Sequence, residues 1–218
     1  MDNDWGVPSP FPRRFDPYGG APPPETFTTH LLVASPRLMD PNFARRVILI
    51  LEHGEHGALG VVLNKPGGVG VDEVLPQWHP LATPPAELFT GGPVARNAII
   101  GLARLRVGED GDDPTGMSPP EGWRPLIPDV HPVGTIDLGA GPGVVTEAII
   151  GVRLFSGYAG WDAGQLEAEI SEGSWYVVRA EPGDPVSADP EGLWPRVLRR
   201  QGGSLALVSG YPIDPATN

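Results

Sequence analysis

The sequence contains no cysteine and a single lysine, Lys65. Without cysteine there is no disulfide framework, no thiolate metal site and no cysteine nucleophile. The absence of disulfides agrees with a reducing compartment, and we expect a cytoplasmic protein. No stretch approaches the roughly 18 uninterrupted apolar residues of a transmembrane helix, and the N-terminus lacks a basic region followed by an apolar one. We therefore expect neither a membrane span nor a secretion signal.

Basic side chains are few relative to acidic ones. The 218 residues include 15 Lys and Arg against 27 Asp and Glu, which gives a formal net charge of −12. Such a chain is repelled by the phosphate backbone of nucleic acids unless its cations cluster. The densest basic group is Arg196, Arg199 and Arg200, near the C-terminal end of an expected helix, where cations suit the helix dipole. Direct binding to DNA is therefore not expected.

The usual sequence anchors of catalysis are also missing. There is no GxSxG elbow, no SxxK pair and no Walker lysine. A triad assembled from residues distant in sequence stays open, because triads are recognised by geometry. Its candidates are Ser35, Ser156, His30 and His53. We predict a protein without catalytic residues and without a cofactor.

The composition instead favours a fold rich in turns. There are 30 glycines and 28 prolines, which predict short strands and loops rather than a helical bundle. Residues 1–25 hold seven prolines and few aliphatic side chains, and we predict a disordered tail there. Residues 26–218 suit a single domain. Within it, residues 108–122 predict an acidic exposed loop; Pro114 stands where a calcium loop needs an oxygen ligand.

The strongest pattern lies in residues 31–66. Two apolar runs at 47–51 and 58–63 flank a polar turn and predict a hairpin of buried strands. Asp40 before Pro41 predicts the cap of a brief helical turn. Further strands are expected at 28–35, 87–90, 97–105, 123–127, 134–138, 152–158, 174–180 and 204–209.

Two longer helices complete the expected architecture. Asp162 and Gln165 have the spacing of a capping box, and Gly173 closes that helix. Asp189 caps a last helix, whose apolar face begins at Leu193. The glycine-rich residues 67–70 predict a flexible turn that leads into a shorter helix near residues 71–75. We predict an α+β fold: one domain with twisted, mixed but mainly antiparallel sheets of about nine short strands, and two main helices packed on them.

The hairpin region also resembles a known family. Its residues fit the pattern ASPxLxDPNFxRxVxLIxEHxxxGALGVVLNxP, which resembles the signature of the YqgE/AlgH family, also labelled UPF0301. Three later blocks fit in the expected order, at residues 91–94, 155–167 and 214–218, so the resemblance runs from about residue 28 to the C-terminus. Members are named transcriptional regulators. The resemblance implies a non-enzymatic, indirect regulator that binds a protein or a ligand.

The only tempting metal constellation lies in the hairpin turn. His53 and His56, with Glu52 and Glu55 beside them, offer nitrogen and carboxylate ligands. Their spacing is neither HExxH nor HxxEH, since both of these motifs span five residues of a helix. We interpret the segment as a polar turn and predict no metal site.

The resemblance singles out a set of polar and aromatic residues whose structural roles compete with a binding role. Asp40 and Gln165 suit caps, and Asn64 suits the end of a strand. The alternative is a groove that holds an unknown protein or small molecule, used by a sensor or an enzyme near Asn64, His53 and Tyr158. We expect a monomer or a weak homo-oligomer. The candidate ligand-binding residues are Asp40, Asn42, Arg45, His53, Asn64, Gly91, Gly92, Tyr158, Trp161 and Gln165.

Overall fold

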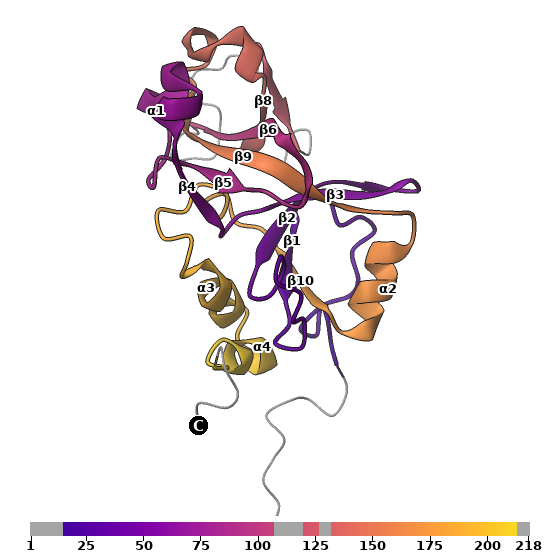
Figure 1. Cartoon of the computed structure of the whole chain (residues 1–218). Coiled ribbons are helices and arrows are strands. Elements are labelled where there is room, and N and C mark those ends of the chain that lie inside the picture. Colours follow the sequence, from indigo (N-terminus) through magenta and orange to yellow (C-terminus); the bar gives the residue numbers. More distant parts are fainter. Residues whose placement is uncertain (1–14, 107–119, 127–131, 213–218) are drawn as a thin grey trace, which may run out of the picture.

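The backbone is organised around one long strand, β9 (Ile149–Trp161), which joins two halves of a curled sheet (Figure 1). The computed structural model describes residues 15–106, 120–126 and 132–212. Most of the predicted acidic loop, residues 1–14 of the predicted tail and the family block at 214–218 lie outside the described residues.

The first half of the sheet contains the predicted hairpin. β2 (Val47–Gly54) and β3 (Gly57–Val62) pair antiparallel through a two-residue turn, as the apolar runs predict. β1 (His30–Ala34) pairs with β2, and β10 (Trp175–Arg179) pairs with β1, so the order is β10-β1-β2-β3. β3 then pairs with the last residues of β9.

The second half surrounds the earlier part of β9. On one side β9 pairs antiparallel with β6 (Val94–Leu105), which is followed by β8 (Val133–Ile136) and β7 (Trp123–Pro125). On the other side it pairs in parallel with β5 (Glu87–Thr90), whose partner is β4 (Pro66–Gly70). The α+β prediction with mainly antiparallel pairing is confirmed.

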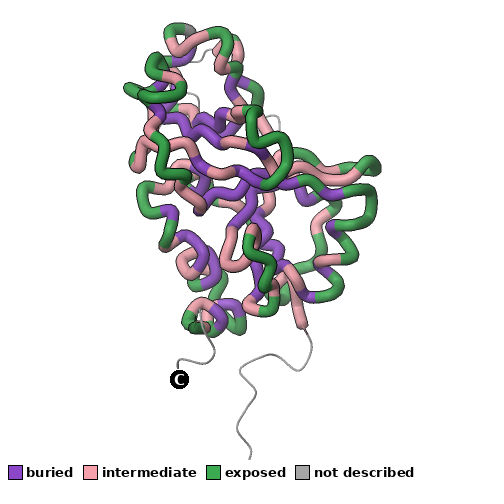
Figure 2. Tube along the Cα trace, viewed as in Figure 1, coloured by how far each residue is buried: buried purple, intermediate pink, exposed green. Residues whose placement is uncertain are grey.

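Helices cover both faces of the first half. Along β1, alternate residues point to opposite faces, and the two sets enter different clusters of the core. Leu31 and Val33 pack with α3 (Leu193–Arg200) and α4 (Gly203–Val208), while Leu32 packs with α2 (Gln165–Glu172). Buried backbone accordingly runs along the central strands (Figure 2). Short helical segments in the second half are α1 (Val71–Val74), η1 (Pro76–Leu81), η2 (Leu138–Ala140) and η3 (Pro142–Val144).

Three predicted local structures differ in the structure. The predicted strand at 204–209 is instead helix α4 up to Val208, because Leu205 and Val208, three apart, are buried against α3 and the sheet. Residues 41–45 form turns instead of a helix, although Asp40 does accept the Asn42 N–H at 2.8 Å. The predicted turn at 67–70 is part of strand β4.

Helix boundaries also differ from the predicted caps. α2 begins at Gln165 with Gly164 as its N-cap, although the Gln165 side chain accepts the Asp162 N–H at 3.0 Å, as a capping box requires. α3 begins at Leu193, and Asp189 caps the preceding turn by accepting the Gly192 N–H at 3.0 Å. Both predicted caps therefore make their bonds one turn before the helix. No helix in the described ranges is long and apolar enough to cross a membrane.

The described part of the predicted tail contacts β10. The Pro17 carbonyl accepts the Val177 N–H at 2.7 Å, and the Phe15 ring lies 5.2 Å from the Tyr176 ring, centroid to centroid. β10 stands at an edge of the sheet, where unpaired backbone groups invite pairing with other chains. Residues 15–17 thus cover part of that edge.

The two halves of the sheet meet where residues 91 and 92 cross β9, with no side chain between the two backbones. β9 bends at Gly157, whose φ is 69°, in the left-handed region that favours glycine. A Cβ on Gly157 would lie 2.8 Å from the Gly92 carbonyl oxygen, and a Cβ on Gly92 would overlap the Tyr158 carbonyl. Gly91 donates to the Ser156 carbonyl at 2.8 Å. The Gly-Gly-Pro turn therefore brings two backbones into close contact.

This crossing predicts a severe effect of Gly92→Ala. The added methyl group would meet rigid backbone, so we expect the free energy of unfolding to fall by about 3 kcal/mol or more. Urea denaturation followed by circular dichroism measures the loss. The matched control is Gly54→Ala, where a Cβ meets nothing within 4 Å. Equal stability of the two variants would contradict the role assigned to the crossing.

Candidate functional site

A groove of about 470 Å³ opens between the sheet and the C-terminal helices. One wall comes from the segments that enter β2 and leave β3, and the other from α3 and the residues that flank α3 and α4. This volume falls within the range of small-molecule sites. The lining residues are Arg45, Arg46, Asn64, Lys65, Pro66, Glu191, Trp194, Pro195, Ser209 and Tyr211.

Asn64 builds the sheet-side wall. Its side chain is 3% exposed; Oδ1 accepts the Val47 N–H and Nδ2 donates to the Arg45 carbonyl, both at 2.9 Å. Its own carbonyl accepts Nη1 of Arg46 at 3.0 Å. A buried amide that uses its acceptor and a donor in this way fixes the two chain segments together. Asn64 therefore positions Arg45 and Arg46 rather than offering a free group to a ligand.

Arg45 joins the two walls. Its guanidinium carbon lies 4.1 Å from the centroid of the Trp194 ring, and Nη2 donates to the carbonyl oxygens of Tyr211, at 2.8 Å, and of Pro212. Partial burial lowers the pKa of Arg45 from its usual value. The Arg45 guanidinium therefore stacks on the Trp194 indole and at the same time donates charged hydrogen bonds to the residues after α4, which it holds against α3.

The sheet-side wall also carries cations that lack an acidic partner. Burial lowers the pKa of Arg46, and its buried Nε has no hydrogen-bond partner. The pKa of Lys65 is lowered first by burial and then by the charges of Arg46 and Arg96, against the opposite effect of Asp40. Within the part of the chain that the structure describes, Arg46, Lys65 and Arg96 form no ion pair.

A second polar cluster lies at α2, away from the groove. Glu169 accepts the indole N–H of Trp161 at 3.0 Å and that of Trp175 at 2.8 Å, and its other oxygen accepts the Gln165 amide at 2.9 Å. His53 Nε2 lies 2.8 Å from a Glu167 carboxylate oxygen. These bonds fasten α2 to the hairpin, to β9 and to β10, so their role is architectural.

The candidate residues thus divide among several places. Arg45 and Asn64 line the groove, whereas His53, Trp161 and Gln165 belong to the α2 cluster. The others have local roles: Asp40 and Asn42 in a turn, Gly91 and Gly92 at the backbone crossing, and Tyr158 against the core.

The structure does not bring Asn64, His53 and Tyr158 together in one groove. Asn64 bonds to Val47, at the first residue of β2, while His53 pairs with Ala58 near the other end of the hairpin. Six residues of extended strand separate the two positions, or about 20 Å. The groove that the structure does contain combines Arg45 and Asn64 with residues from α3 and α4.

The structure also does not bring together the serine–histidine triad or the metal ligands considered from the sequence. Ser35 donates to the Gly173 carbonyl at 2.7 Å and Ser156 to the Arg96 carbonyl at 2.5 Å, so neither hydroxyl meets a histidine. Among the residues that the structure describes, no group of three or more His, Asp or Glu side chains is placed to hold a metal ion.

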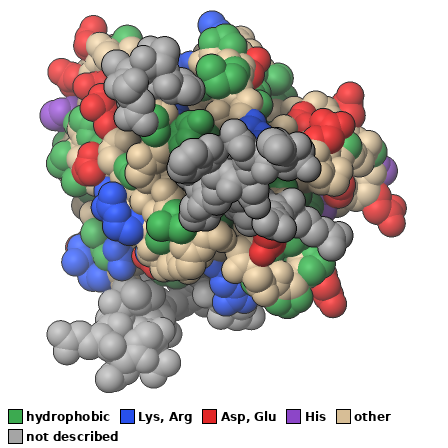
Figure 3. Space-filling view, turned by 90° about the horizontal axis from the view of Figure 1, so that it is seen from below, with side chains coloured by type: hydrophobic (Ala, Val, Ile, Leu, Met, Phe, Trp, Pro, Cys, Tyr) green, Lys and Arg blue, Asp and Glu red, His purple; other side chains and the backbone are tan. Residues whose placement is uncertain are grey.

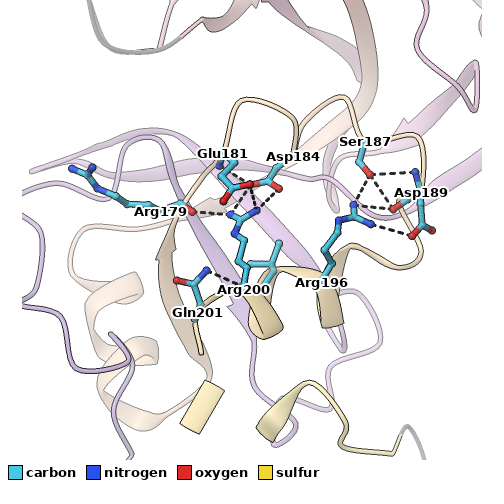
Figure 4. Close-up of polar contacts among 9 residues, drawn as sticks. Arg179, Glu181, Asp184, Ser187, Asp189, Arg196, Arg200 and Gln201 are labelled. Carbon is cyan, nitrogen blue, oxygen red and sulfur yellow. Dashed lines mark hydrogen bonds and ion pairs between the residues drawn. The ribbon is translucent and has the colours of Figure 1, made fainter. Parts of the chain in front are cut away.

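Two arginines of the basic cluster of α3, Arg196 and Arg200, are paired with acidic side chains (Figure 4). Arg200 forms two bonds with the carboxylate of Asp184, at 2.7 and 2.8 Å, and Asp184 is 5% exposed. Arg196 pairs with Asp189 at 3.0 Å. On the face seen from below, basic side chains form separate small groups among acidic and uncharged surface (Figure 3). On this face the basic side chains therefore form no continuous surface for a phosphate backbone.

Sequence patterns gave no sign of a buried arginine in β9. Arg153 is 2% exposed and donates to the carbonyls of Pro84, Pro85 and Ser187 at 2.8, 3.2 and 2.9 Å. Its guanidinium lies 4.1 Å from the Phe89 ring centroid. Burial lowers the pKa of Arg153 to about 10, so the group is charged at neutral pH.

Several known proteins are similar to this chain in sequence and in fold. The AlgH-like family model matches residues 31–206. The chain belongs to the AlgH-like family. A UPF0301 protein of Streptomyces coelicolor, SCO2948, is 48% identical over 194 residues, which cover 88% of this chain and 96% of that protein. A UPF0301 protein of Thermobifida fusca is 46% identical over 199 residues, 88% of this chain and 96% of its own.

Two solved structures are similar to the AlgH-like chain. The crystal structure of protein DIP2367 from Corynebacterium diphtheriae has a TM-score of 0.78 at 33% identity, covering 89% of this chain and 97% of that one. The solution structure of the AlgH protein from Pseudomonas aeruginosa has a TM-score of 0.58 at 31% identity, covering 88% and 97%. The resemblance found in the sequence is confirmed.

The His53–Glu167 contact predicts a pH-dependent contribution to stability. The hydrogen bond from His53 lowers the pKa of Glu167, so the stabilisation is present above the ordinary carboxyl pKa of 4.5 and is lost as the pH falls through the lowered value. Because the Glu167 side chain is 49% exposed, we expect Glu167→Gln to cost only about 0.5 kcal/mol at pH 7.

Urea unfolding of both proteins at pH 7, 5 and 3.5 measures this contribution. The difference between wild type and Glu167→Gln should shrink as the pH decreases below 5. Glu172→Gln, at an exposed position of the same helix, serves as the control and should differ little from wild type throughout. A loss that stays constant down to pH 3.5 would contradict the electrostatic interpretation.

Proposed function

We propose that this AlgH-like protein is a cytoplasmic, non-catalytic binding protein whose ligand occupies the groove between the sheet and α3–α4. Its influence on transcription, in the proposal, is indirect. The observation that carries the proposal is the groove itself: about 470 Å³, with a cationic wall on one side and an apolar, aromatic wall on the other. Sites of this size with a few fixed polar groups are typical of small-molecule binding.

The walls of the groove are held by contacts that do not need a ligand. Asn64 fixes the sheet side through three hydrogen bonds, and Arg45 fixes the helix side through Trp194 and Tyr211. A site that is already ordered avoids part of the entropy cost of binding. This rigidity supports a specific ligand.

The chemistry of the lining favours binding over catalysis. The hydroxyl of Ser209 donates to the Ala206 carbonyl at 2.6 Å, and no histidine is among the lining residues. A serine nucleophile needs a general base in contact with its hydroxyl, whereas the hydrogen bond that Ser209 makes among the described residues goes to a backbone carbonyl. The sensor alternative raised by the sequence is therefore retained in this proposal, but in the groove that Arg45 and Asn64 shape, not near His53 and Tyr158.

A variant that blocks the groove tests the proposal. Glu191 lines the groove and is exposed, so Glu191→Trp should place an indole over it without disturbing the core. We expect at least one fraction of a bacterial metabolite extract to raise the melting temperature of the wild-type protein, because a ligand that binds only the folded state stabilises it. The shift should disappear in Glu191→Trp.

The matched control is Glu172→Trp, which adds the same side chain at an exposed position of α2. It should keep the full shift in melting temperature. A shift that survives in Glu191→Trp would place the ligand elsewhere, and no shift with any fraction would contradict the binding proposal.

Indirect regulation predicts no direct contact with DNA. The net charge of −12 and the acidic partners of Arg196 and Arg200 support this. We expect no change in the fluorescence anisotropy of labelled duplex DNA at 50 mM salt, where electrostatic binding is strong. Binding that weakens steeply with added salt would overturn the indirect part of the proposal.

A further inference from the structure

The cationic wall of the groove combines side chains from two separate segments, and a third segment adds a cation close to it. Arg46 precedes β2 and Lys65 lies between β3 and β4, and both line the groove; Arg96, in an exposed stretch of β6, lies outside the lining, but its charge acts on Lys65. We infer that this cluster binds a compact dianionic group, such as a phosphate monoester, carried by the ligand of the groove. The inference rests on the proposed function and specifies its ligand.

Electrostatics supply the first argument. Like charges that converge without an acidic partner repel one another, and a chain with 27 acidic residues has many carboxylates that could have relieved this repulsion. Among the described residues none pairs with Arg46, Lys65 or Arg96. Burial is the main cause of the lowered pKa of Lys65, and repulsion by Arg46 and Arg96 adds to it, against the opposite effect of the Asp40 carboxylate. An anion between the cations removes the cost.

Backbone geometry supplies the second argument. Arg45 and Ala95 each directly precede a cation of the cluster, and both have positive φ, at 59° and 45°. Outside glycine this conformation is uncommon and costs on the order of 1 kcal/mol or more, and it persists where surrounding contacts impose it. Here the contacts are visible: Asn64 donates to the Arg45 carbonyl, and Ser156 donates to the Arg96 carbonyl.

The hydrogen-bonding capacity of the cluster favours a phosphate-like group. Arg46 uses Nη1 on the Asn64 carbonyl, while its buried Nε has no partner. Lys65 adds a compact charge with several donors. A guanidinium fork with an ammonium suits the several oxygens and the double charge of a phosphate, whereas one carboxylate would balance a single cation.

The rest of the groove indicates what the phosphate is attached to. Trp194, Pro195 and Tyr211 line the helix side and offer apolar surface to a ring or a short carbon skeleton. Glu191 lies on that side as well and would repel a second anion while accepting hydrogen bonds from hydroxyl or amino groups. The ligand class is therefore a small organic phosphate with an uncharged body that carries hydrogen-bond donors.

Isothermal titration at low ionic strength with phenyl phosphate, inorganic phosphate, benzoate and benzyl alcohol tests the inference. We expect phenyl phosphate to bind most tightly, inorganic phosphate and benzoate more weakly, and benzyl alcohol not measurably. Lys65→Gln and Arg96→Gln should each weaken binding of phenyl phosphate about tenfold, which corresponds to 1.4 kcal/mol. The control Arg124→Gln removes one charge from an exposed position of β7 and should change affinity less than twofold.

Lys65→Gln and Arg96→Gln should both fold normally. Among the described residues, neither side chain makes a hydrogen bond or an ion pair that the substitution would remove. Equal weakening by Arg124→Gln would show non-specific attraction and overturn the inference. Equal binding of benzyl alcohol and phenyl phosphate would also overturn it, while leaving a ligand in the groove. If no probe binds but an extract still stabilises the protein in a Glu191-dependent manner, the anion inference fails and the proposed function stands.

Discussion

Where β9 crosses residues 91 and 92, backbone packs directly against backbone, and the positions of many other groups follow from that contact. Gly91 bonds to both strands it touches: its N–H donates to Ser156 and its carbonyl accepts the Val62 N–H, each at 2.8 Å. The end of β3 is fixed in this way. Asn64 and Lys65 come directly after it, and the Lys65 carbonyl accepts the Thr90 N–H at 2.9 Å. The glycines of the family pattern thus position the sheet-side wall of the groove without touching a ligand themselves.

The groove lies where the sheet meets the layer of α3 and α4, and it concentrates charge of the rarer sign. In a protein with an excess of acidic groups, a few unpaired cations beside low-dielectric walls create a local positive potential, which attracts small anions and excludes most other surfaces. Arg196 and Arg200 of α3 act differently, because Asp189 and Asp184 neutralise them within the fold. The presence or absence of a carboxylate partner, rather than the number of arginines, distinguishes cations that can bind a ligand from cations that stabilise the fold.

The sequence predicted most of the fold because the hairpin strands are continuous apolar runs that are buried on both faces. It mispredicted residues 204–209, since a short apolar run has the same composition in a strand and in a helix, and only packing against α3 distinguishes them. The burial of Arg153 was missed for a related reason. A single arginine within an apolar strand is expected to be exposed, and the sequence does not show that three distant carbonyls accept its hydrogen bonds.

The candidate site was predicted less well, and the cause is physical. Residues that fit the family pattern, such as Asn64 and Gln165, bond to backbone or to neighbouring side chains and maintain the architecture. The cations that face the groove, Arg46 and Lys65, occupy variable positions of that pattern. Arg96, in the stretch of β6 where the pairing with β9 shifts between Val94 and Ile99, acts on Lys65 from outside the lining of the groove. Long-range convergence of this kind leaves no periodic trace along the chain.

Arg153 has a consequence for how the molecule opens. Its guanidinium links β9 to the loop before β5 and to the loop between β10 and α3, so segments that are distant in sequence share one buried charge. Releasing either loop alone would leave that charge short of a hydrogen bond, at a cost of roughly 1.5–3 kcal/mol for each bond lost. Partial detachment of these loops is therefore penalised, and the two loops are expected to open together more readily than either opens alone.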